Sequence, residues 1–562
     1  MRQKNFDKCM FACLVLFSFI VSGCTSSVQV SEQTDAIETY GLTDINTRQG
    51  FLSTGIGNQN QVLMQVVLTR NLEKTALPLH GVSVQLAGNT QPKELSLLKV
   101  YATETPFFYG DKQQYARLLA SAAIPAKNEE FNLLFDQPYT PIGKENYLWL
   151  VADIAQSAVA GHTIDLAVSH LIVDKKENRL VRYAIASPNP VGETVVYPKQ
   201  QMLFSPWDAG SEFYRIPAMI VLHSEKKGKQ GRILTVTDRR YRYNWDLPNH
   251  IDLVARFSDD NGTNWSAPSV IAGLYNDSID NQGPDFGYGD AALVETVSGK
   301  VVCMMAADHQ YQSSTAQEPI RMFMGQSNDG GDTWEKPKEI TSQLYNTVFG
   351  GAPSPLQGVF VTSGKGLCLS KQQGDNARYN GRILFAMVCK FESGPYQNYI
   401  LYSDDEGAHW KVSANSAYVG GDEAKLIEEN DGTVVLSTRR SGERGFNRST
   451  DAGTTWGEQT VDPQIWGTSC NADLLVYNDS VYIHSILNAP DRRNLTLYLS
   501  TDKGKTWPYE MVVNTLPAAY STMVKCADGD IGLYFEDGTM SDHYSMNFIK
   551  FPYEWIMSNK RQ

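Results

Sequence analysis

An octapeptide of the form Ser-x-Asp-x-Gly-x-x-Trp occurs five times in the C-terminal two-thirds of this 562-residue chain. The copies begin 46 to 76 residues apart, at Ser258, Ser327, Ser403, Ser449 and Ser500. In each copy the Asp can accept hydrogen bonds from turn amides, the Gly can adopt a positive φ and the Trp can cover the turn. Each copy therefore predicts a β-hairpin, and repeats of this length predict one four-stranded propeller blade per copy, with insertions in the early blades. One further blade without the octapeptide makes a six-bladed β-propeller, which we place at residues 195–562.

The rest of the chain also indicates β-structure. The whole chain has 44 Gly, 24 Pro and 11% aromatic residues, which suits many short strands joined by turns, and we predict an all-β fold. Apolar and polar residues alternate in short runs such as 61–68 and 147–152, so residues 41–187 are expected to form a β-sandwich. A hinge at Ser187–Pro190 follows. The sandwich either binds carbohydrate or packs against the propeller.

The first 24 residues predict an export signal. Three basic residues precede the apolar run from Met10 to Val21, which is too short to span a membrane comfortably. The following Ser22-Gly23-Cys24 resembles the lipobox of bacterial lipoproteins, in which the Cys becomes the acylated first residue. The alternative is a simple secretory signal with a Cys there by chance. Residues 25–40 are rich in Ser, Thr, Gln and Glu and are expected to be a flexible tether.

Charge and cysteine content exclude several classes of partner. The formal net charge is −13, and no Lys/Arg block is long enough to neutralise a run of phosphates, so we expect no nucleic-acid partner. An acidic protein must hold an anionic substrate with locally placed arginines. No Cys-x-x-Cys or His-Glu-x-x-His occurs, so we expect no metal and no cofactor. The five cysteines from Cys303 onward are expected to be buried small hydrophobes inside strands.

The octapeptide resembles the Asp box of sialidase propellers, although other glycosidases and binding modules also carry it. Tyr214-Arg215-Ile216-Pro217, just ahead of the first copy, is similar to the Tyr/Phe-Arg-Ile-Pro motif of bacterial sialidases. The resemblance covers residues 195–562, and the N-terminal region is similar to domains that precede the propeller in some gut-bacterial sialidases. It implies an exo-α-sialidase that hydrolyses terminal sialic acid linkages of glycoproteins, glycolipids and oligosaccharides, with retention of configuration through a tyrosyl-linked intermediate.

Sialic acid carries a carboxylate on its anomeric carbon, and guanidinium groups bind carboxylates with fixed geometry at any working pH. The resemblance implies three carboxylate-binding arginines: Arg215, Arg439 in Leu-Ser-Thr-Arg, and Arg492 in Arg-Arg-Asn-Leu-Thr-Leu. Adjacent strand residues face opposite ways, so Arg440 and Arg493 remain alternatives to the second and third. By the same resemblance, Glu536 orients the first arginine.

The catalytic residues are likewise implied by the resemblance. Tyr520 in Ala-Tyr-Ser is the nucleophile, because a neutral oxygen avoids repulsion by the substrate carboxylate, and Glu423 in Gly-Asp-Glu takes its proton. These two side chains are expected to touch. Asp246 follows an Asp-x-Arg by eight residues, as does the family's general acid, and is expected to have a raised pKa on a mobile loop.

Neighbouring residues complete the predicted site. The competitors of Asp246 for the role of general acid are Asp238 and Asp252. The loop match also makes Arg240 a predicted substrate contact. Asp290 in Gly-Tyr-Gly-Asp-Ala either lines the pocket for the N-acetyl group or stabilises a turn.

Two rival functions differ from the enzyme in the residues they need. A non-catalytic sialic-acid-binding propeller would keep the arginines but does not need the Tyr/Glu pair or Asp246. A glycosidase acting on neutral glucans would leave three pocket arginines unexplained. We expect a monomer, exported and lipid-anchored to the bacterial cell envelope, whose partners are sialylated glycans. The linkage preference and the form of the released sugar remain open.

Overall fold

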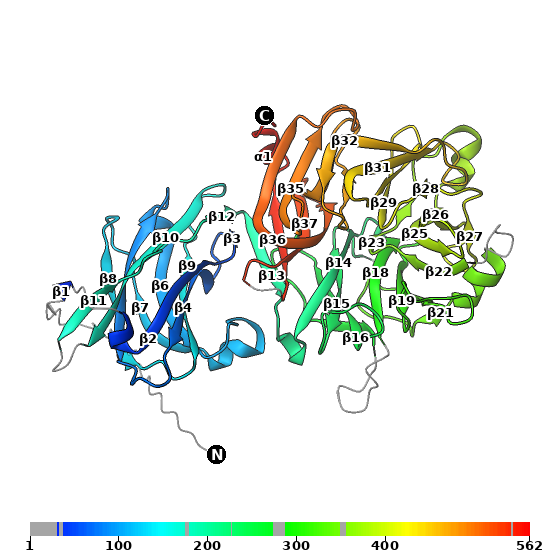
Figure 1. Ribbon diagram of the computed structural model, residues 1–562. Coiled ribbons are helices and arrows are strands. Elements are labelled where there is room, and N and C mark those ends of the chain that lie inside the picture. The colour runs from blue at the N-terminus through cyan, green and yellow to red at the C-terminus, as the bar shows by residue number, and fades with distance from the viewer. Residues whose placement is uncertain are drawn as a thin grey trace, which may run out of the picture.

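The computed structural model describes residues 31–32, 37–174, 179–225, 228–273, 287–348, 356–540 and 543–561. Within these residues the chain forms two β-rich units that lie side by side, a sandwich near the N-terminus and a propeller that extends to the C-terminus (Figure 1). The predicted signal, with Cys24, lies outside the described residues.

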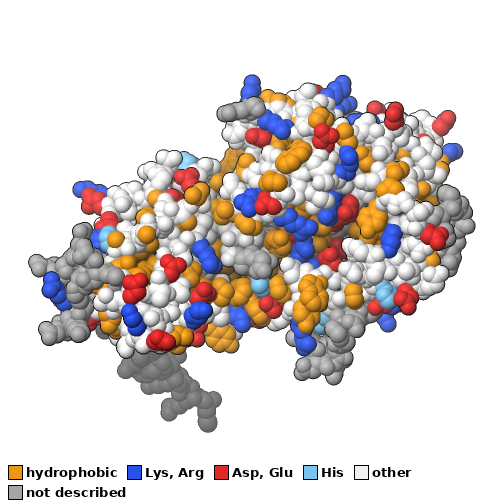
Figure 2. Space-filling view, in the orientation of Figure 1, with side chains coloured by type: hydrophobic (Ala, Val, Ile, Leu, Met, Phe, Trp, Pro, Cys, Tyr) orange, Lys and Arg blue, Asp and Glu red, His pale blue; other side chains and the backbone are white. Residues whose placement is uncertain are grey.

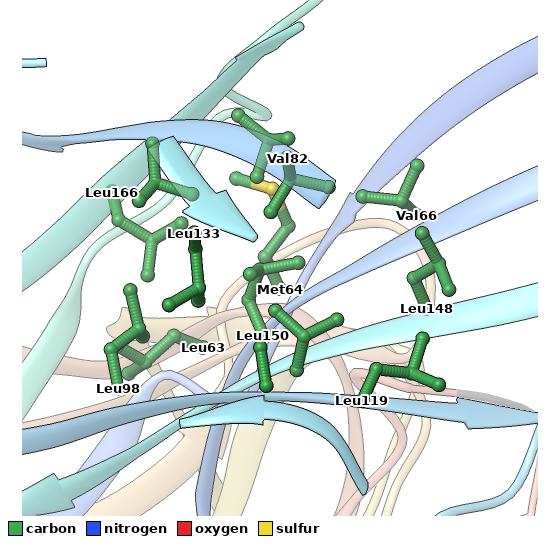
Figure 3. Close-up of a cluster of buried hydrophobic side chains, with 14 of the residues drawn as sticks. Leu63, Met64, Val66, Val82, Leu98, Leu119, Leu133, Leu148, Leu150 and Leu166 are labelled. Carbon is green, nitrogen blue, oxygen red and sulfur yellow. The ribbon is translucent and has the colours of Figure 1, made fainter. Parts of the chain in front are cut away.

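The N-terminal unit consists of two sheets packed face to face. The first sheet contains β1(Ser31–Glu32), β3(Ser53–Gly55), β5(Leu79–Ala87), β8(Phe131–Tyr139), β10(Thr163–Asp174), β11(Leu180–Ala184) and β12(Thr194–Tyr197). The second contains β2(Leu42–Gln49), β4(Gln61–Arg70), β6(Leu95–Thr103), β7(Arg117–Ala122) and β9(Glu145–Ile154). Side chains such as Met64 and Leu150 from one sheet and Val82 and Leu166 from the other meet in a common core (Figure 3). This burial of one face of each sheet stabilises the sandwich.

The propeller is built from four-stranded blades. Blade I is β14(Phe213–Val221), β15(Ile233–Arg240), β16(Ile251–Ser258) and β17(Ser269–Ala272). Blade II is β18(Tyr288–Glu295), β19(Val301–Ala307), β20(Arg321–Ser327) and β21(Lys338–Glu339), with β23(Gly364–Lys365) beside β18. Blade III is β22(Leu356–Val361), β25(Ile383–Phe391), β26(Gln397–Ser403) and β27(Lys411–Val412), with β24(Leu367–Cys368) and β28(Tyr418–Val419).

Of the remaining blades, V and VI share one long strand. Blade IV is β29(Ala424–Glu428), β30(Val434–Thr438), β31(Gly442–Ser449) and β32(Thr460–Gly467). Blade V is β33(Leu474–Val476), β34(Tyr482–Leu487), β35(Arg493–Ser500) and the first half of β36(Tyr509–Lys525). Blade VI is the second half of β36 with β37(Ile531–Asp537), β38(Ser545–Phe551) and β13(Lys199–Phe204). The sixth blade is thus closed by a strand from the start of the propeller, and the predicted all-β, six-bladed fold is confirmed.

Each octapeptide forms the turn between the third and fourth strands of its blade, in blades I to V. In the first copy, Ser258 Oγ contacts Asp260 Oδ1 at 2.8 Å, and the same oxygen of Asp260 accepts the Asn264 amide at 2.8 Å. The same two bonds recur in the other four copies. The glycines at the fifth position have φ between 77° and 92°, as the turn requires.

The chain passes from the sandwich to the propeller at Pro198, later than the predicted hinge. Residues 187–190 are bound into the sandwich: Pro188 O accepts the Val168 amide at 2.8 Å, and Asn189 donates to Asp165 at 2.8 Å. Strand β12 pairs with β10 and β3 of the sandwich, and β13 begins only two residues after β12 ends. The short turn leaves the two units in direct contact.

Helical segments are short. They are η1(Ile37–Tyr40), η2(Pro92–Glu94), η3(Gly110–Tyr115), η4(Asp208–Gly210), η7(Gln343–Val348), η8(Gly374–Tyr379) and α1(Glu554–Met557). None of the described helices has the length and apolarity needed to cross a bilayer. Of the five cysteines from Cys303 onward, four are buried, whereas Cys368 is only half-buried.

Candidate active site

An open cavity of about 170 Å³ lies where the inner strands of several blades end. Its wall combines charged and aromatic side chains. The lining residues are Arg215, Ile216, Asp246, Leu247, Asp290, Tyr311, Gln312, Ile320, Phe360, Tyr396, Asp422, Glu423, Arg439, Arg492 and Tyr520. Figure 2 shows that Lys and Arg side chains gather near the middle of the propeller on the face in view, with acidic side chains beside them.

Arg215, on β14, is fixed by a buried carboxylate. Glu536, on β37, is completely buried and accepts Nε and Nη2 of Arg215, both at 3.1 Å. It also accepts the backbone amides of Ile216 at 2.7 Å and Tyr520 at 2.9 Å. Although burial opposes the charge, Glu536 and Tyr520 raise the pKa of Arg215. Glu536 therefore occupies the orienting position that the sequence assigned to it.

Ile216 adopts a φ of 61°, an uncommon value for a β-branched residue. It lies at an irregularity in the β14–β15 pairing, between Arg215 and Ala218. The bond from its amide to Glu536 supports this strained backbone. A strained residue thus directly follows the first cavity arginine.

Arg439, just after β30, connects the two predicted catalytic residues. Its Nη1 lies 2.6 Å from Glu423 Oε2 and 3.1 Å from the hydroxyl of Tyr520, and its Nε donates to Ser469 Oγ at 3.1 Å. Among the described residues no direct hydrogen bond joins Glu423 to Tyr520, so the expected contact is mediated by Arg439. Burial and the negative charge of Glu423 raise the pKa of Tyr520 well above its usual value. The hydroxyl is therefore neutral at ordinary pH and needs a base before it can attack.

The third arginine at the cavity is Arg492. Its guanidinium carbon lies 5.6 Å from the centre of the Tyr520 ring, and that of Arg215 lies 5.2 Å from the same centre. By contrast, Arg493 is exposed and pairs with Asp491 at 2.6 Å. Of the neighbouring pair in blade IV, Arg439 lines the cavity, and Arg440 lies outside it, 5.9 Å from the ring centre of Tyr418. Within each doubled pair, the cavity receives the first arginine.

Asp246 lies on the loop between β15 and β16, with a side chain that is 68% exposed. Its Oδ1 accepts Arg240 Nη1 at 3.0 Å. Burial of the carboxyl would raise the pKa of Asp246, but Arg240 and Arg215 lower it below its ordinary value. The expectation of a raised pKa is therefore wrong, because the nearby Arg240 and the more distant Arg215 both act on this carboxylate.

Arg240 lies behind the cavity wall rather than in it. The residue is 1% exposed, and it binds Asp238 at 2.9 Å and the carbonyl oxygens of Asn244 and Trp245 at 2.9 and 3.1 Å. The substrate contact of Arg240 stays a prediction, and in the structure Arg240 holds the loop that carries Asp246.

The competitors of Asp246 are both buried and bonded away from the cavity. Asp238 pairs with Arg240, and burial raises its pKa to about 6. Asp252 accepts Arg239 at 2.7 Å and the hydroxyl of Tyr241 at 2.8 Å. Neither lines the cavity, which leaves Asp246 as the accessible carboxylate of the three.

Asp290 has features of both roles that were considered for it. It lines the cavity, and it also occupies a turn-like backbone conformation with a φ of 58°. Its amide donates to Asp238 Oδ1 at 3.2 Å. Burial, together with Asp238 and Asp246, raises the pKa of its carboxyl well above the usual range. A protonated Asp290 can donate a hydrogen bond into the cavity.

A family model described as a BNR repeat-like domain matches residues 248–533, just over half of the chain. That span runs from the Asp246 loop to β37. The chain belongs to the BNR-repeat sialidase family. The match covers all five octapeptides from end to end.

Two curated relatives and one solved structure are similar to this sialidase-family chain. The sialidase of Micromonospora viridifaciens is 26% identical over 394 residues, which cover 66% of this chain and 56% of that protein. The sialidase of Bacteroides fragilis is 27% identical over 325 residues, 54% of this chain and 55% of that protein. The chain thus spans a little more than half the length of these relatives. The solved Hadza microbial sialidase Hz136 superposes with a TM-score of 0.64 at 21% identity and covers 91% of this chain and 99% of its own.

The sialidase-family site also contains aromatic residues that the sequence did not single out. Tyr311 packs against Phe360 and Tyr396, with ring centres 4.8 and 5.2 Å apart, and all three line the cavity. On the Asp246 loop, Tyr243 and Trp245 stack at 4.5 Å while 43% and 67% exposed. The chain has 28 tyrosines, so composition gave no signal. In the sequence, only Trp245, directly before the predicted acid Asp246, could have indicated an aromatic residue at the site.

No group of three His, Cys, Asp or Glu side chains in the described part of the chain is arranged to hold a metal ion. What the cavity does offer is three arginines, a neutral tyrosine and carboxylates on either side of it. This set can bind an anion and transfer protons near it.

Proposed function

We propose that this chain is an exo-α-sialidase that hydrolyses terminal sialic acid α-linkages of glycoproteins, glycolipids and oligosaccharides. One observation carries the proposal: Arg215, Arg439 and Arg492 converge on Tyr520, whose hydroxyl shares a guanidinium nitrogen with Glu423. Three cations around a neutral tyrosine suit a sugar whose anomeric carbon bears a carboxylate. The names of the two curated relatives support the same activity.

In the proposed mechanism the three arginines hold the substrate carboxylate. The oxygen of Tyr520 attacks the anomeric carbon as its proton passes to Glu423, and the bond to the leaving oxygen breaks as Asp246 gives that oxygen a proton. Asp246 then takes a proton from water, the water oxygen attacks the same carbon, and the tyrosine leaves and recovers its proton from Glu423. Two displacements at one carbon retain the configuration.

The lowered pKa of Asp246 fits this scheme if substrate binding changes its surroundings. Arg215 and Arg240 lower it in the free site. A bound sialic acid brings a carboxylate to Arg215, which neutralises part of the positive field and raises the pKa of Asp246. In this proposal, substrate binding therefore favours the protonated form of Asp246, which can give its proton to the leaving oxygen.

Incubation with a fluorogenic sialoside, followed by NMR of the released sugar, tests the activity. Release of free α-sialic acid as the first product supports hydrolysis with retention. An anhydro sugar or a transferred glycoside would redirect the proposal to a different reaction of the same intermediate. Binding without turnover would indicate a sialic-acid-binding module.

We also propose that the protein is exported and anchored through a lipid on Cys24, based on the lipobox-like Val-Ser-Gly-Cys after the apolar run. Wild type should incorporate labelled fatty acid and appear in the membrane fraction, and Cys24→Ser should do neither. A mature N-terminus downstream of residue 24 would refute the anchor and leave the proposed activity untouched.

A further inference from the structure

A buried lysine lies beneath the catalytic glutamate. Lys425, on β29, is 1% exposed and lies two residues after Glu423, which directly precedes the strand. Its ammonium donates to the carbonyl oxygen of Ser363 and, at 2.9 Å, to Asn471 Oδ1. Among the described residues, no carboxylate comes within the 4.0 Å of an ion pair with this ammonium. The proposed mechanism gives this cation no role.

The charged ammonium of Lys425 is energetically unfavourable at this buried position. Burial, together with the neighbouring cations Arg444 and Lys365, lowers the pKa of Lys425 to about 8, against the opposing effect of Asp473 and Glu423. A buried ammonium without an ion-pair partner is destabilising, because its hydration is lost without full compensation.

The backbone at Gly364 leaves room for the side chain of Lys425. Gly364 has a φ of 109°, and a Cβ there would lie 3.0 Å from Cε of Lys425. Groups that cost stability are common at functional sites, where their charge is used.

Short contacts lead from the ammonium to Glu423. Asn471, which binds Lys425 through Oδ1, donates its Nδ2 to Ser363 Oγ at 2.9 Å. Ser363 Oγ in turn donates to Glu423 Oε1 at 3.5 Å, a long bond. The three residues come from different blades, since Ser363 follows β22, Lys425 is on β29 and Asn471 precedes β33.

Each oxygen of Glu423 therefore has its own partner. Arg439 holds Oε2 at 2.6 Å on the cavity side, and the Ser363 hydroxyl meets Oε1 from below. The other charged groups near the ammonium are bonded elsewhere. Asp473 pairs with Lys365 at 2.8 Å and accepts the Met523 amide, and Arg444 binds Ser437 at 3.0 Å. Lys425 is thus the cation whose bonds lead to the underside of Glu423.

We propose that Lys425 is a positioning residue for the proposed sialidase reaction: through Asn471 and Ser363 it orients Glu423, the carboxylate that takes the proton of Tyr520. Because this inference rests on the proposed function, its test includes turnover by the wild type.

The test compares Lys425→Met with Lys525→Met, a matched change at a lysine whose ammonium binds the Tyr477 carbonyl at 3.1 Å, remote from the site. For Lys425→Met we expect kcat to fall about 10- to 100-fold, less than the ~10²–10⁴ that a general base itself contributes, with KM little changed. Its melting temperature should equal or exceed that of the wild type, because a desolvated charge is removed. Lys525→Met should match the wild type in turnover.

The pH profile gives a second readout. The kcat of the wild type should decline above about pH 8, where Lys425 loses its proton, and this decline should be absent in Lys425→Met. A merely structural lysine would instead lower stability and turnover together, without a change in the pH profile. If Lys425→Met does not fold, Ser363→Ala tests the same inference, because it removes only the hydroxyl that contacts Glu423. We expect it to lower kcat and to leave the melting temperature unchanged.

Wild-type kcat and pH profile in Lys425→Met, or unchanged kcat in Ser363→Ala, would overturn the inference while leaving the proposed function intact. An inactive wild type would instead refute the proposed function.

Discussion

At the scale of single residues, one guanidinium nitrogen of Arg439 holds the centre of the site together through its contacts. Arg439 Nη1 binds both Glu423 and Tyr520, so the proposed base and the proposed nucleophile are held at one point although they lie 97 residues apart in the chain. Positioning of this kind can supply a large part of a rate enhancement.

Tyr520→Phe tests the nucleophile directly. The ring and its packing remain, so the melting temperature should stay close to that of the wild type, whereas turnover of a sialoside should fall about 10³-fold or more because the attacking oxygen is gone. A fluorinated sialosyl fluoride, whose covalent intermediate breaks down slowly, should label the wild type on the peptide that contains Tyr520. Label on Glu423 instead would reassign the nucleophile.

Arg492→Ala and Arg493→Ala form a matched pair of neighbouring substitutions. Arg492 lines the cavity, so its loss should cost about 2–5 kcal/mol of transition-state stabilisation, seen as a lower kcat/KM. Arg493 is paired with Asp491 in solvent, and such a pair contributes about 0–1 kcal/mol, so activity and stability should hardly change. Equal effects of the two substitutions would mean that Arg492 does not bind the substrate carboxylate.

Asp246→Ala should distinguish substrates by their leaving groups. An alkoxide leaving group needs a proton, so cleavage of a natural sialoside should fall about 10²-fold or more, while an activated aryl sialoside should lose much less. The comparison of kcat for the two substrates in both proteins gives the answer. A uniform loss would indicate that Asp246 binds substrate without acting as an acid.

The sequence predicted some of these residue roles and not others. Motif position was enough for Arg215 and Glu536, which bind each other across 321 residues. Strand alternation could not choose between Arg439 and Arg440, because both follow the last paired residue of β30, where regular alternation ends. The lowered pKa of Asp246 could not be predicted either, since it depends in part on Arg215, which only the fold brings near this carboxylate.

At the scale of elements, the octapeptide turns explain why the blades are regular. In the third copy, Asp405 accepts the His409 amide and the Ser403 hydroxyl, both at 2.8 Å, and these bonds, despite opposition from partial burial, lower its pKa to about 2. A carboxylate with a depressed pKa stabilises the fold above the pKa of the unfolded chain, near 4. That contribution is lost as pH falls toward 2.

Asp405→Ala should therefore destabilise the protein by about 1 kcal/mol at neutral pH, the typical cost of losing a side chain that caps backbone amides. The difference from the wild type should shrink as pH falls from about 4 to about 2, because protonation removes the same bonds in the wild type. Thermal unfolding across this range measures it. Asp479→Ala, at an exposed turn without the octapeptide, should leave the free energy of unfolding at the wild-type value. If it destabilises the protein as much as Asp405→Ala does, the octapeptide has no special role in stability.

The octapeptides predicted five blades directly, but they could not show how the sixth is made. The motif joins the third and fourth strands of a blade that are consecutive in sequence. In blade VI the third strand is β38 and the fourth is β13, which lie at opposite ends of the propeller sequence, so no turn connects them. The blade without a motif is thus the one that closes the ring.

At the scale of the whole molecule, this closure links the sandwich to the integrity of the propeller. Strand β13 begins two residues after β12 of the sandwich and pairs antiparallel with β38 from Lys199 to Phe204. Leu203 and Phe204 are buried among residues of blades I and VI. Just before the strand, Tyr197 packs on Phe551 and Trp555, with ring centres 5.8 and 5.7 Å away. The start of the propeller and its end therefore stabilise each other.

A chain that begins at residue 195 keeps Tyr197 and β13, whereas one that begins at residue 206 lacks both. The first should fold and turn over a small fluorogenic sialoside, because every residue of the cavity and the whole of blade VI are retained. The second loses the ladder with β38 and the burial of Leu203 and Phe204, each worth about 1.5–3 kcal/mol, and it leaves β38 as an open edge that can pair with other molecules.

We therefore expect the shorter chain to unfold at lower temperature or to aggregate, as thermal unfolding and size-exclusion chromatography would show. Equal stability of the two chains would mean that blade VI is stable with three strands. Failure of both chains would assign the stability of the propeller to the sandwich itself rather than to the closing strand.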